Sequence, residues 1–123
     1  MALGAFSTSL NVKDIAASIT FYKTLGFDIF HDNSEHNYCI LKNGDTLLGL
    51  FLGHIPANTL TFNPGWDHNA QPYGDFEDVR AIQKRLQDAG IELTATCDPD
   101  RAGPAHIMLM DPDDNAILID QHL

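Results

Sequence analysis

Ser18-Ile19-Thr20-Phe21-Tyr22-Lys23-Thr24-Leu25-Gly26-Phe27 is the stretch that decides the fold. Its apolar side chains fall near helical spacing, so a helix is predicted from about Asp14 to Leu25. Gly26 stands where a left-handed C-cap is expected. A strand is predicted directly afterwards, from Phe27 to His31, so this stretch is the joint between a helix and a strand.

A second joint of the same kind occurs at Ala89-Gly90-Ile91. It closes a predicted helix from about Phe76 to Ala89, for which Asp75 is a suitable N-cap. The apolar residues of this helix form one stripe that is expected to be buried: Val79, Ile82, Leu86 and Ala89. The two halves of the chain therefore share a plan.

Eight strands complete that plan, and several of them alternate apolar and polar residues. They are predicted at about 6–12, 27–31, 38–42, 46–52, 58–63, 91–96, 106–110 and 116–120. Asn43-Gly44 is a strong hairpin turn. The order is strand–helix–strand–strand–strand, twice, which indicates an internal duplication within one domain of residues 1–123. The first module covers about residues 5–53 and the second about residues 57–123.

Composition limits the partners of this domain. The chain has 123 residues and a formal net charge of −10, so nucleic acid and anionic membrane surfaces would repel it. Two cysteines fit no zinc motif and are expected to be free thiols in the cytoplasm. The first residues lack the pattern of a signal peptide.

Short motifs carry a resemblance to a known family. They are Leu10-Asn11-Val12-Lys13-Asp14, the stretch quoted above, and Asp111-Pro112-Asp113-Asp114-Asn115. On these motifs the chain resembles the glyoxalase / bleomycin-resistance / extradiol-dioxygenase (vicinal-oxygen-chelate) superfamily. The resemblance implies an α+β fold: two βαβββ modules forming a curved, cup-like mixed sheet, with helices on the outside and the ligand in the cup. Asp114 replaces the usual glycine of the family's turn, and Asp tolerates the left-handed backbone needed there.

The resemblance also assigns the places from which metal-dependent members take their ligands, on the first, fourth, fifth and eighth strands. Those places are held here by Ser7, Leu50, Thr59 and Leu118. Leucine has no lone pair, and hydroxyl groups are weak neutral ligands. No metal and no cofactor are therefore expected.

Strand alternation indicates which side chains line the cup. They are Ser7, Ser9, Leu48, Leu50, Leu52, Thr59, Thr61, Met108, Leu118 and Asp120, with His106 and His122 near the rim. This mostly apolar wall suits a small organic ligand better than an ion, although these side chains can also simply pack the cup shut. Trp66, in the long loop of residues 63–74, can stack on a planar ligand or plug the core or a dimer interface.

Histidines are the candidate acid–base groups. Four of them can converge near the mouth of the cup: His54, His68, His106 and His122. A general acid or base is favoured over a metal site because no ligand-pair spacing is present. Asp120 and His122 share one side of their strand; they are a proton-transfer pair or, as favoured here, a solvated chain end.

The favoured function is a metal-free binding protein for a small hydrophobic or aromatic molecule, acting as a homodimer. Its predicted ligand-binding residues are Ser7, Ser9, Leu50, Thr59, Trp66, His106, Met108, Leu118 and Asp120. Two alternatives stay open. One is a metal-dependent lyase, isomerase or dioxygenase related to glyoxalase I, and the other is a metal-free enzyme with His106 or Asp120 as its base.

Overall fold

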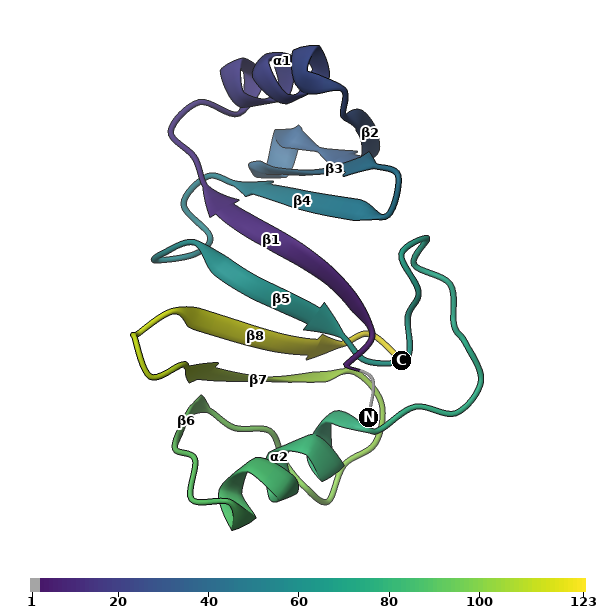
Figure 1. Ribbon diagram of the computed structural model, residues 1–123, viewed down its shortest axis with the longest axis vertical. Coiled ribbons are helices and arrows are strands. Elements are labelled where there is room, and N and C mark those ends of the chain that lie inside the picture. The colour runs from purple at the N-terminus through teal and green to yellow at the C-terminus, as the bar shows by residue number, and fades with distance from the viewer. Residues whose placement is uncertain (1–2) are drawn as a thin grey trace. The chain divides into compact units, whose positions relative to one another are not determined.

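The computed structural model describes residues 3–123 and has two helices and eight strands (Figure 1). In chain order these are β1 (Ala5–Asn11), α1 (Ile15–Leu25), β2 (Asp28–Asn33), a short 3-10 turn (Ser34–His36), β3 (Tyr38–Asn43), β4 (Thr46–Phe51), β5 (Thr59–Asn63), α2 (Val79–Asp88), β6 (Leu93–Ala95), β7 (Ala105–Met110) and β8 (Ala116–Gln121). The α+β class and the repeated strand–helix–strand–strand–strand order are both confirmed.

The chain divides into two compact units. The N-terminal unit is Ser7–Thr59, and the C-terminal unit joins the residues up to Phe6 with Leu60–Leu123. In the N-terminal unit the strand order is β2-β3-β4-β1, with β1 parallel to β4 and the other pairs antiparallel. In the C-terminal unit the order is β5-β8-β7-β6, and β7 is antiparallel to both neighbours.

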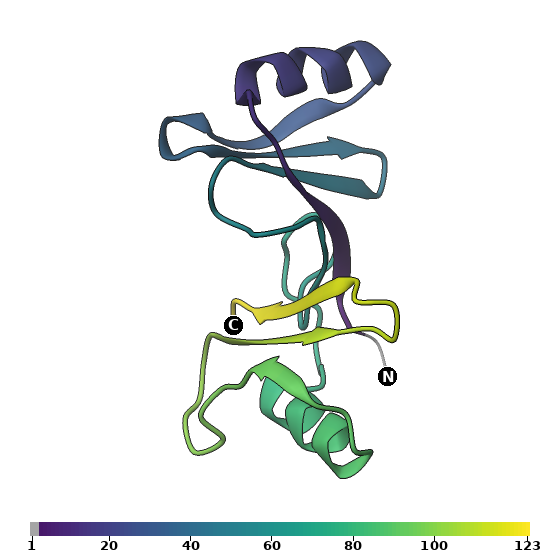
Figure 2. The same ribbon diagram turned by 90° about the vertical axis from the view of Figure 1, so that its left-hand side faces the viewer.

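Helix α1 forms as its sequence predicts. The Asp14 carboxylate accepts a hydrogen bond from the Ala17 N–H at 3.0 Å, which caps the first turn. Gly26 ends the helix with φ of 122°, and its N–H donates to the Tyr22 and Lys23 carbonyls. A side chain rarely adopts such a φ, which explains the glycine at this position. Figure 2 shows α1 lying against one face of its unit's sheet.

Helix α2 begins three residues later than the predicted start at Phe76. Its N-cap is Asp78, whose carboxylate accepts from the Arg80 N–H at 2.9 Å, so the prediction of Asp75 as the N-cap is wrong. Glu77 lies outside the helix and forms an ion pair with Arg85 at 2.8 Å. In a run of acidic residues, more than one carboxylate can cap the helix. Here the contacts of the Asp78 side chain determine that Asp78 is the N-cap.

The core of the C-terminal unit lies between α2 and the sheet. Its buried members are Val79, Ile82, Ile107, Leu109 and Ile119, and Leu86 packs against them. The predicted stripe of α2 is therefore confirmed at three of its four positions. Ala89 is wrong, because it is the C-cap residue and is exposed.

The turn between β7 and β8 also forms as its sequence predicts. Asp114 adopts a left-handed backbone with φ of 64°. The Asp111 carboxylate accepts from the N–H groups of Asp113 and Asn115 at 2.8 and 2.9 Å. The Asn115 side-chain amide also donates to this carboxylate at 2.7 Å, and this bond, followed by the two backbone bonds, lowers the pKa of Asp111. Neither helix within residues 3–123 is long and apolar enough to cross a membrane.

Candidate functional site

Strands β7 and β8 expose one face on the side away from α2. His106 lies opposite Asp120 in the antiparallel ladder, and Met108 lies opposite Leu118. Residues that pair across a ladder point to the same face, and the residues between them are in the core with α2. The face thus joins four of the residues predicted to bind a ligand. It combines two half-buried apolar side chains with an imidazole and a carboxylate.

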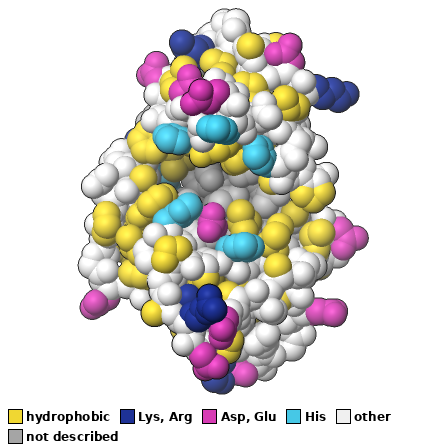
Figure 3. All heavy atoms as spheres, turned by 180° about the vertical axis from the view of Figure 1, so that it is seen from behind, with side chains coloured by type: hydrophobic (Ala, Val, Ile, Leu, Met, Phe, Trp, Pro, Cys, Tyr) yellow, Lys and Arg dark blue, Asp and Glu magenta, His cyan; other side chains and the backbone are white. Residues whose placement is uncertain are grey.

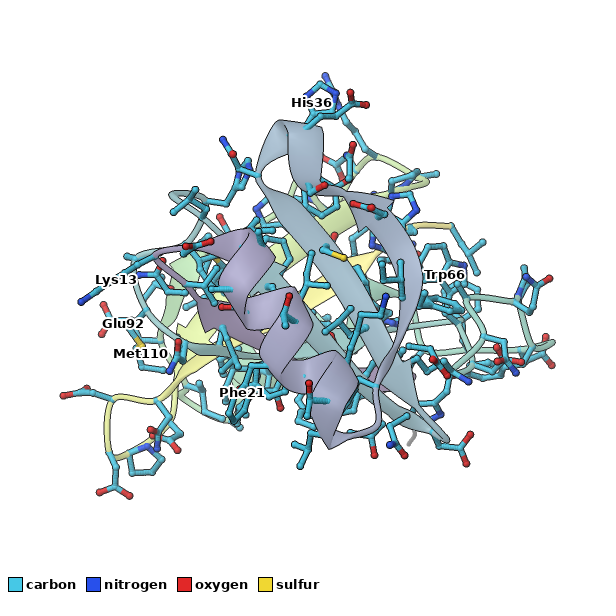
Figure 4. The ribbon with its side chains drawn as sticks, turned by 90° about the horizontal axis from the view of Figure 1, so that it is seen from above. Lys13, Phe21, His36, Trp66, Glu92 and Met110 are labelled. Atoms are coloured by element: carbon cyan, nitrogen blue, oxygen red, sulfur yellow. The ribbon has the colours of Figure 1, made fainter. Side chains whose placement is uncertain are left out.

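The loop between β5 and α2 places an aromatic ring at the end of this face. A bridge between Trp66 and Pro72 closes the loop into a small hairpin. The Asp67 carboxylate accepts from the N–H groups of Asn69 and Gln71 at 2.8 and 3.1 Å and thereby fixes the turn. Trp66 is half-buried, and Figure 4 shows its side chain among those of this loop. The loop is therefore built to hold the indole in place.

Trp66 stacks on His122, just beyond the end of β8. The two ring centroids are 4.3 Å apart, and the rings are parallel to within 4°. The Ala5 N–H donates to the Trp66 carbonyl at 2.9 Å, so the start of β1 steadies the backbone beneath the stack. The stack fixes the plane of the imidazole while leaving its side chain 43% exposed.

His122 also contacts Asp120, two residues earlier on the same side of the strand. Its Nε2 lies 3.3 Å from the Asp120 carboxylate. The hydrogen bond to this carboxylate raises the pKa of His122, and partial burial opposes the rise. The Asn63 side chain donates to the Asp120 carbonyl at 2.9 Å, which holds this part of the backbone. Trp66, His122 and Asp120 together form one ordered group, called here the Trp–His–Asp cluster.

His122 is the residue that the predicted ligand-binding set lacks. The alternation along β8 already put it on the same side as Asp120, but the solvated chain end was favoured. The sequence signal was the spacing of two between a carboxylate and an imidazole. Nothing in the sequence paired His122 with Trp66, which lies 56 positions earlier in the chain.

The other histidines occupy separate places. His68 accepts a long hydrogen bond of 3.5 Å from the Phe6 N–H. His54 belongs to the N-terminal unit, where its Nε2 contacts the His36 carbonyl at 2.7 Å. Figure 3 shows histidine side chains at the surface among hydrophobic ones. Within residues 3–123, no three His, Cys, Asp or Glu side chains come close enough together to hold a metal ion.

Leu50 does not lie where strand alternation predicted. It is fully buried, and it packs with Leu48 and Cys39 against Ile19 and Tyr22 of α1. The predicted placement of Leu48 and Leu50 in the cup is therefore wrong, by one residue of register. The reason is visible in the sequence, because leucines occupy both alternations of β4 and Gly49 supplies no signal.

The face of β4 turned away from α1 carries Leu47, Gly49 and Phe51, and it includes Ser7 and Ser9 through their pairing with Leu47 and Gly49. A Cβ at Gly49 would come within 2.6 Å of the Phe51 ring, so the ring covers the glycine. Phe51 in turn stacks on Tyr38, with centroids 5.7 Å apart. Aromatic rings, rather than a polar side chain, therefore cover this part of β4.

The residues at the places that the resemblance assigns to metal ligands do not fit a metal. With the register corrected, the place on the fourth strand offers glycine or a phenyl ring, and neither has a donor atom. Thr59 on β5 is buried, and its hydroxyl donates to the Ala57 carbonyl at 2.9 Å. Leu118 on β8 is apolar. The side chains at these places cannot form the set of nitrogen and oxygen ligands that a divalent ion requires.

Comparison with known proteins places the chain in a family. The profile of the "Glyoxalase/Bleomycin resistance protein/Dioxygenase superfamily" matches residues 4–119. A structure described as an NAD-dependent benzaldehyde dehydrogenase from Legionella pneumophila is 18% identical, with a TM-score of 0.71 over 96% of this chain and 99% of that one.

Two further structures share the fold. A superfamily member from Vibrio splendidus is 15% identical, with a TM-score of 0.64 over 96% of this chain and 97% of that one. A hypothetical protein from Bacillus halodurans is 10% identical, with a TM-score of 0.61 over 95% of this chain and 92% of that one. No curated protein sequence matches the chain significantly. At such identities the likeness concerns the fold alone.

Proposed function

Because the chain belongs to the glyoxalase/bleomycin resistance protein/dioxygenase superfamily, we propose that it binds a small aromatic or hydrophobic molecule without a metal ion. The binding surface is the face of β7 and β8 with the Trp–His–Asp cluster at its end. The observation that carries the proposal is the stack of Trp66 on His122. The parallel rings of Trp66 and His122 offer a flat aromatic surface to a planar ligand, and the adjacent strand face offers an apolar surface against which the ligand can pack.

The chemistry of the face supports an organic ligand. Met108 and Leu118 are adjacent across the ladder and half-buried, so each keeps apolar surface that a ligand can cover. Met adapts its shape to aromatic surfaces and makes favourable sulfur–ring contacts. His106 and Asp120 add hydrogen-bonding groups that orient a bound molecule.

Fluorescence tests this proposal, because Trp66 is the only tryptophan in the chain. A panel of aromatic and hydrophobic compounds is titrated into the protein while the indole emission is followed. At least one compound class is expected to change the emission saturably. Leu118→Ala is expected to weaken that binding about tenfold, or ~1.4 kcal/mol.

Leu60→Ala is the matched control, since it makes the same change at an exposed leucine of the same unit. It is expected to leave the affinity unchanged. Silence across the whole panel, or equal losses in both variants, would contradict the proposed surface.

The proposal includes a homodimer in the cytoplasm. Phe21 and Leu25 of α1 are 63% and 64% exposed, and residues four apart on a helix are neighbours. A second copy that covers this pair would remove apolar surface from water. Light scattering during gel filtration is expected to give twice the chain mass of 13.6 kDa, and a monomer at tens of micromolar protein would contradict this part.

The cytoplasmic assignment rests on the two thiols. Cys39 and Cys97 are both unpaired, as is usual for proteins in a reducing compartment. Fractionation of the source cells with the native protein tracked by antibody is the test. Recovery in a secreted fraction would contradict it.

A further inference from the structure

We propose that His122 is a general base that removes a proton from a carbon acid bound on the β7–β8 face, with Asp120 as its positioning residue. The inference rests on the proposed function, because it requires that face to hold an organic molecule. It reassigns the acid–base role from His106 or Asp120, which the sequence had suggested, to the imidazole that the structure orients.

The imidazole of His122 has a defined direction. Its Nε2 faces the Asp120 carboxylate at 3.3 Å, so this nitrogen carries the proton that the carboxylate attracts. The lone pair of the neutral ring is then on Nδ1, away from Asp120. A carboxylate that fixes the tautomer of a histidine is a recurrent feature of histidines that accept protons in catalysis.

The imidazole ring of His122 is also held rigidly. An exposed histidine just beyond the end of a strand normally samples several rotamers. Here the Trp66 indole lies parallel to it with the centroids 4.3 Å apart, and the Trp66 loop is itself closed by its bridge to Pro72. The Gln121 amide donates to the Leu123 carbonyl at 2.9 Å, which ties down the backbone on the other side of His122. The base is therefore held in one plane before any ligand binds.

The imidazole of His122 is accessible to a ligand. The His122 side chain is 43% exposed and that of Asp120 is 33% exposed, so a ligand can approach the ring. The titratable groups on the surrounding elements are Asp120 on β8, His106 on β7, and Asp67, His68 and Tyr73 in the Trp66 loop. Asp120 makes an ion-pair contact with His122, and this contact raises the pKa of the imidazole. A higher pKa makes His122 a stronger base once it is deprotonated.

The reaction is a keto–enol tautomerisation. A C–H bond beside a carbonyl group breaks, its electron pair enters the carbonyl to give an enolate, and the proton bonds to Nδ1 of His122. The imidazolium then returns this proton to the enolate oxygen, which yields the enol and regenerates the base. One proton moves from carbon to oxygen, and no oxidant or metal takes part.

The strength of imidazole sets the substrate class. It is a weak base, so the carbon acid must stabilise its own enolate, as 1,3-dicarbonyl compounds do by delocalising the charge over two oxygens. An aryl group on the dicarbonyl suits the indole and Met108. The inferred substrates are therefore aryl 1,3-dicarbonyl compounds.

The experiment uses 1-phenylbutane-1,3-dione, whose enol absorbs strongly in the near ultraviolet. The approach to keto–enol equilibrium is followed with wild type, His122→Gln, Asp120→Asn and His36→Gln. His36 is an exposed histidine of the N-terminal unit, so its variant controls for catalysis by surface imidazoles. Free imidazole at the same concentration provides the solution rate, and circular dichroism confirms that each variant is folded.

Wild type is expected to exceed free imidazole, and His122→Gln to lose about 100-fold of that excess rate. His36→Gln is expected to match wild type. Asp120→Asn is expected to move the midpoint of the pH–rate profile to lower pH, which a merely structural role of Asp120 would not do.

Equal rates for wild type and His122→Gln, or a pH profile unchanged in Asp120→Asn, would overturn the inference. Binding of the dione is measured in parallel through Trp66 emission. Binding without acceleration would remove the general base and leave the proposed function intact. Absence of both would remove the inferred substrate class, and the compound panel would then judge the proposed function by itself.

Discussion

Leu50→Ala distinguishes a core residue from a ligand-lining residue. Leu50 is 0% exposed and packs in the N-terminal unit with Cys39, Leu41 and Leu48. Removing three carbons from such a site costs their transfer free energy plus that of the cavity left behind, about 2–5 kcal/mol in total. A residue lining an open cup would cost much less, because water or a ligand would fill the space.

Urea denaturation followed by circular dichroism measures this loss. With an m-value of about 1.5 kcal/mol/M, a loss of about 3 kcal/mol lowers the midpoint by about 2 M. The m-value itself is expected to stay constant, since the variant folds to the same structure. Ligand affinity, corrected for the folded fraction, is expected to remain that of wild type.

Leu60→Ala is the comparison, because Leu60 is 36% exposed. Its expected loss is less than about 1 kcal/mol. A loss below about 1 kcal/mol for Leu50→Ala as well, together with weaker ligand binding, would refute the assignment of Leu50 to the core and restore the register predicted from alternation.

Three further outcomes are expected. Gln121→Leu should destabilise the protein by about 2 kcal/mol or more in urea denaturation, because the side-chain Oε1 of Gln121 accepts from the Val79 N–H at 2.8 Å and that buried donor would lose its partner; an unchanged midpoint would contradict this. The raised pKa of His122 means that its ion pair stabilises the fold fully below the ordinary pKa near 6.5 and that this contribution is lost as pH rises through the folded pKa. The melting temperature of wild type should therefore fall relative to that of Asp120→Asn as the medium changes from mildly acidic to mildly alkaline, and parallel pH dependences would count against the pair. Burial raises the pKa of the Cys39 thiol, so this thiol should react with Ellman's reagent only as fast as the protein unfolds, and rapid labelling of both cysteines would show that Cys39 is accessible.

The local signals in the sequence predicted most of the fold. Gly26 is the C-cap of α1 as expected, and Asp114 adopts the left-handed backbone of its turn. Such features depend on a few neighbouring residues, so the sequence contains the information that they need. The start of α2 was wrong because Asp75 and Asp78 are both good caps. The choice between them depends on Gln121, whose amide donates to the Asp78 carboxylate at 3.0 Å from 43 positions away.

The candidate site was predictable only in part. The alternation along β7 and β8 correctly predicted that Met108, Leu118 and Asp120 lie on one face. The pattern was readable because the core residues between them are isoleucine or leucine, whereas most residues on the other face are of other types. On β4 the alternation predicted the wrong face for Leu48 and Leu50, because leucine flanks Gly49 on both sides. The stack of Trp66 on His122 could not be predicted, because it depends on the three-dimensional path of a loop.

The most direct test of the proposed binding surface is a methyl and indole NMR map of the bound state. The protein is labelled at Met and Leu methyl groups and at the Trp66 indole nitrogen, and a compound that binds in the fluorescence panel is added. The largest shifts are expected at Met108, Leu118 and the Trp66 N–H, and the shifts of Leu50 are expected to be small because it lies in the core against α1. Shifts concentrated on Leu50 and its neighbours, with Met108 and Leu118 unmoved, would contradict the proposed binding surface.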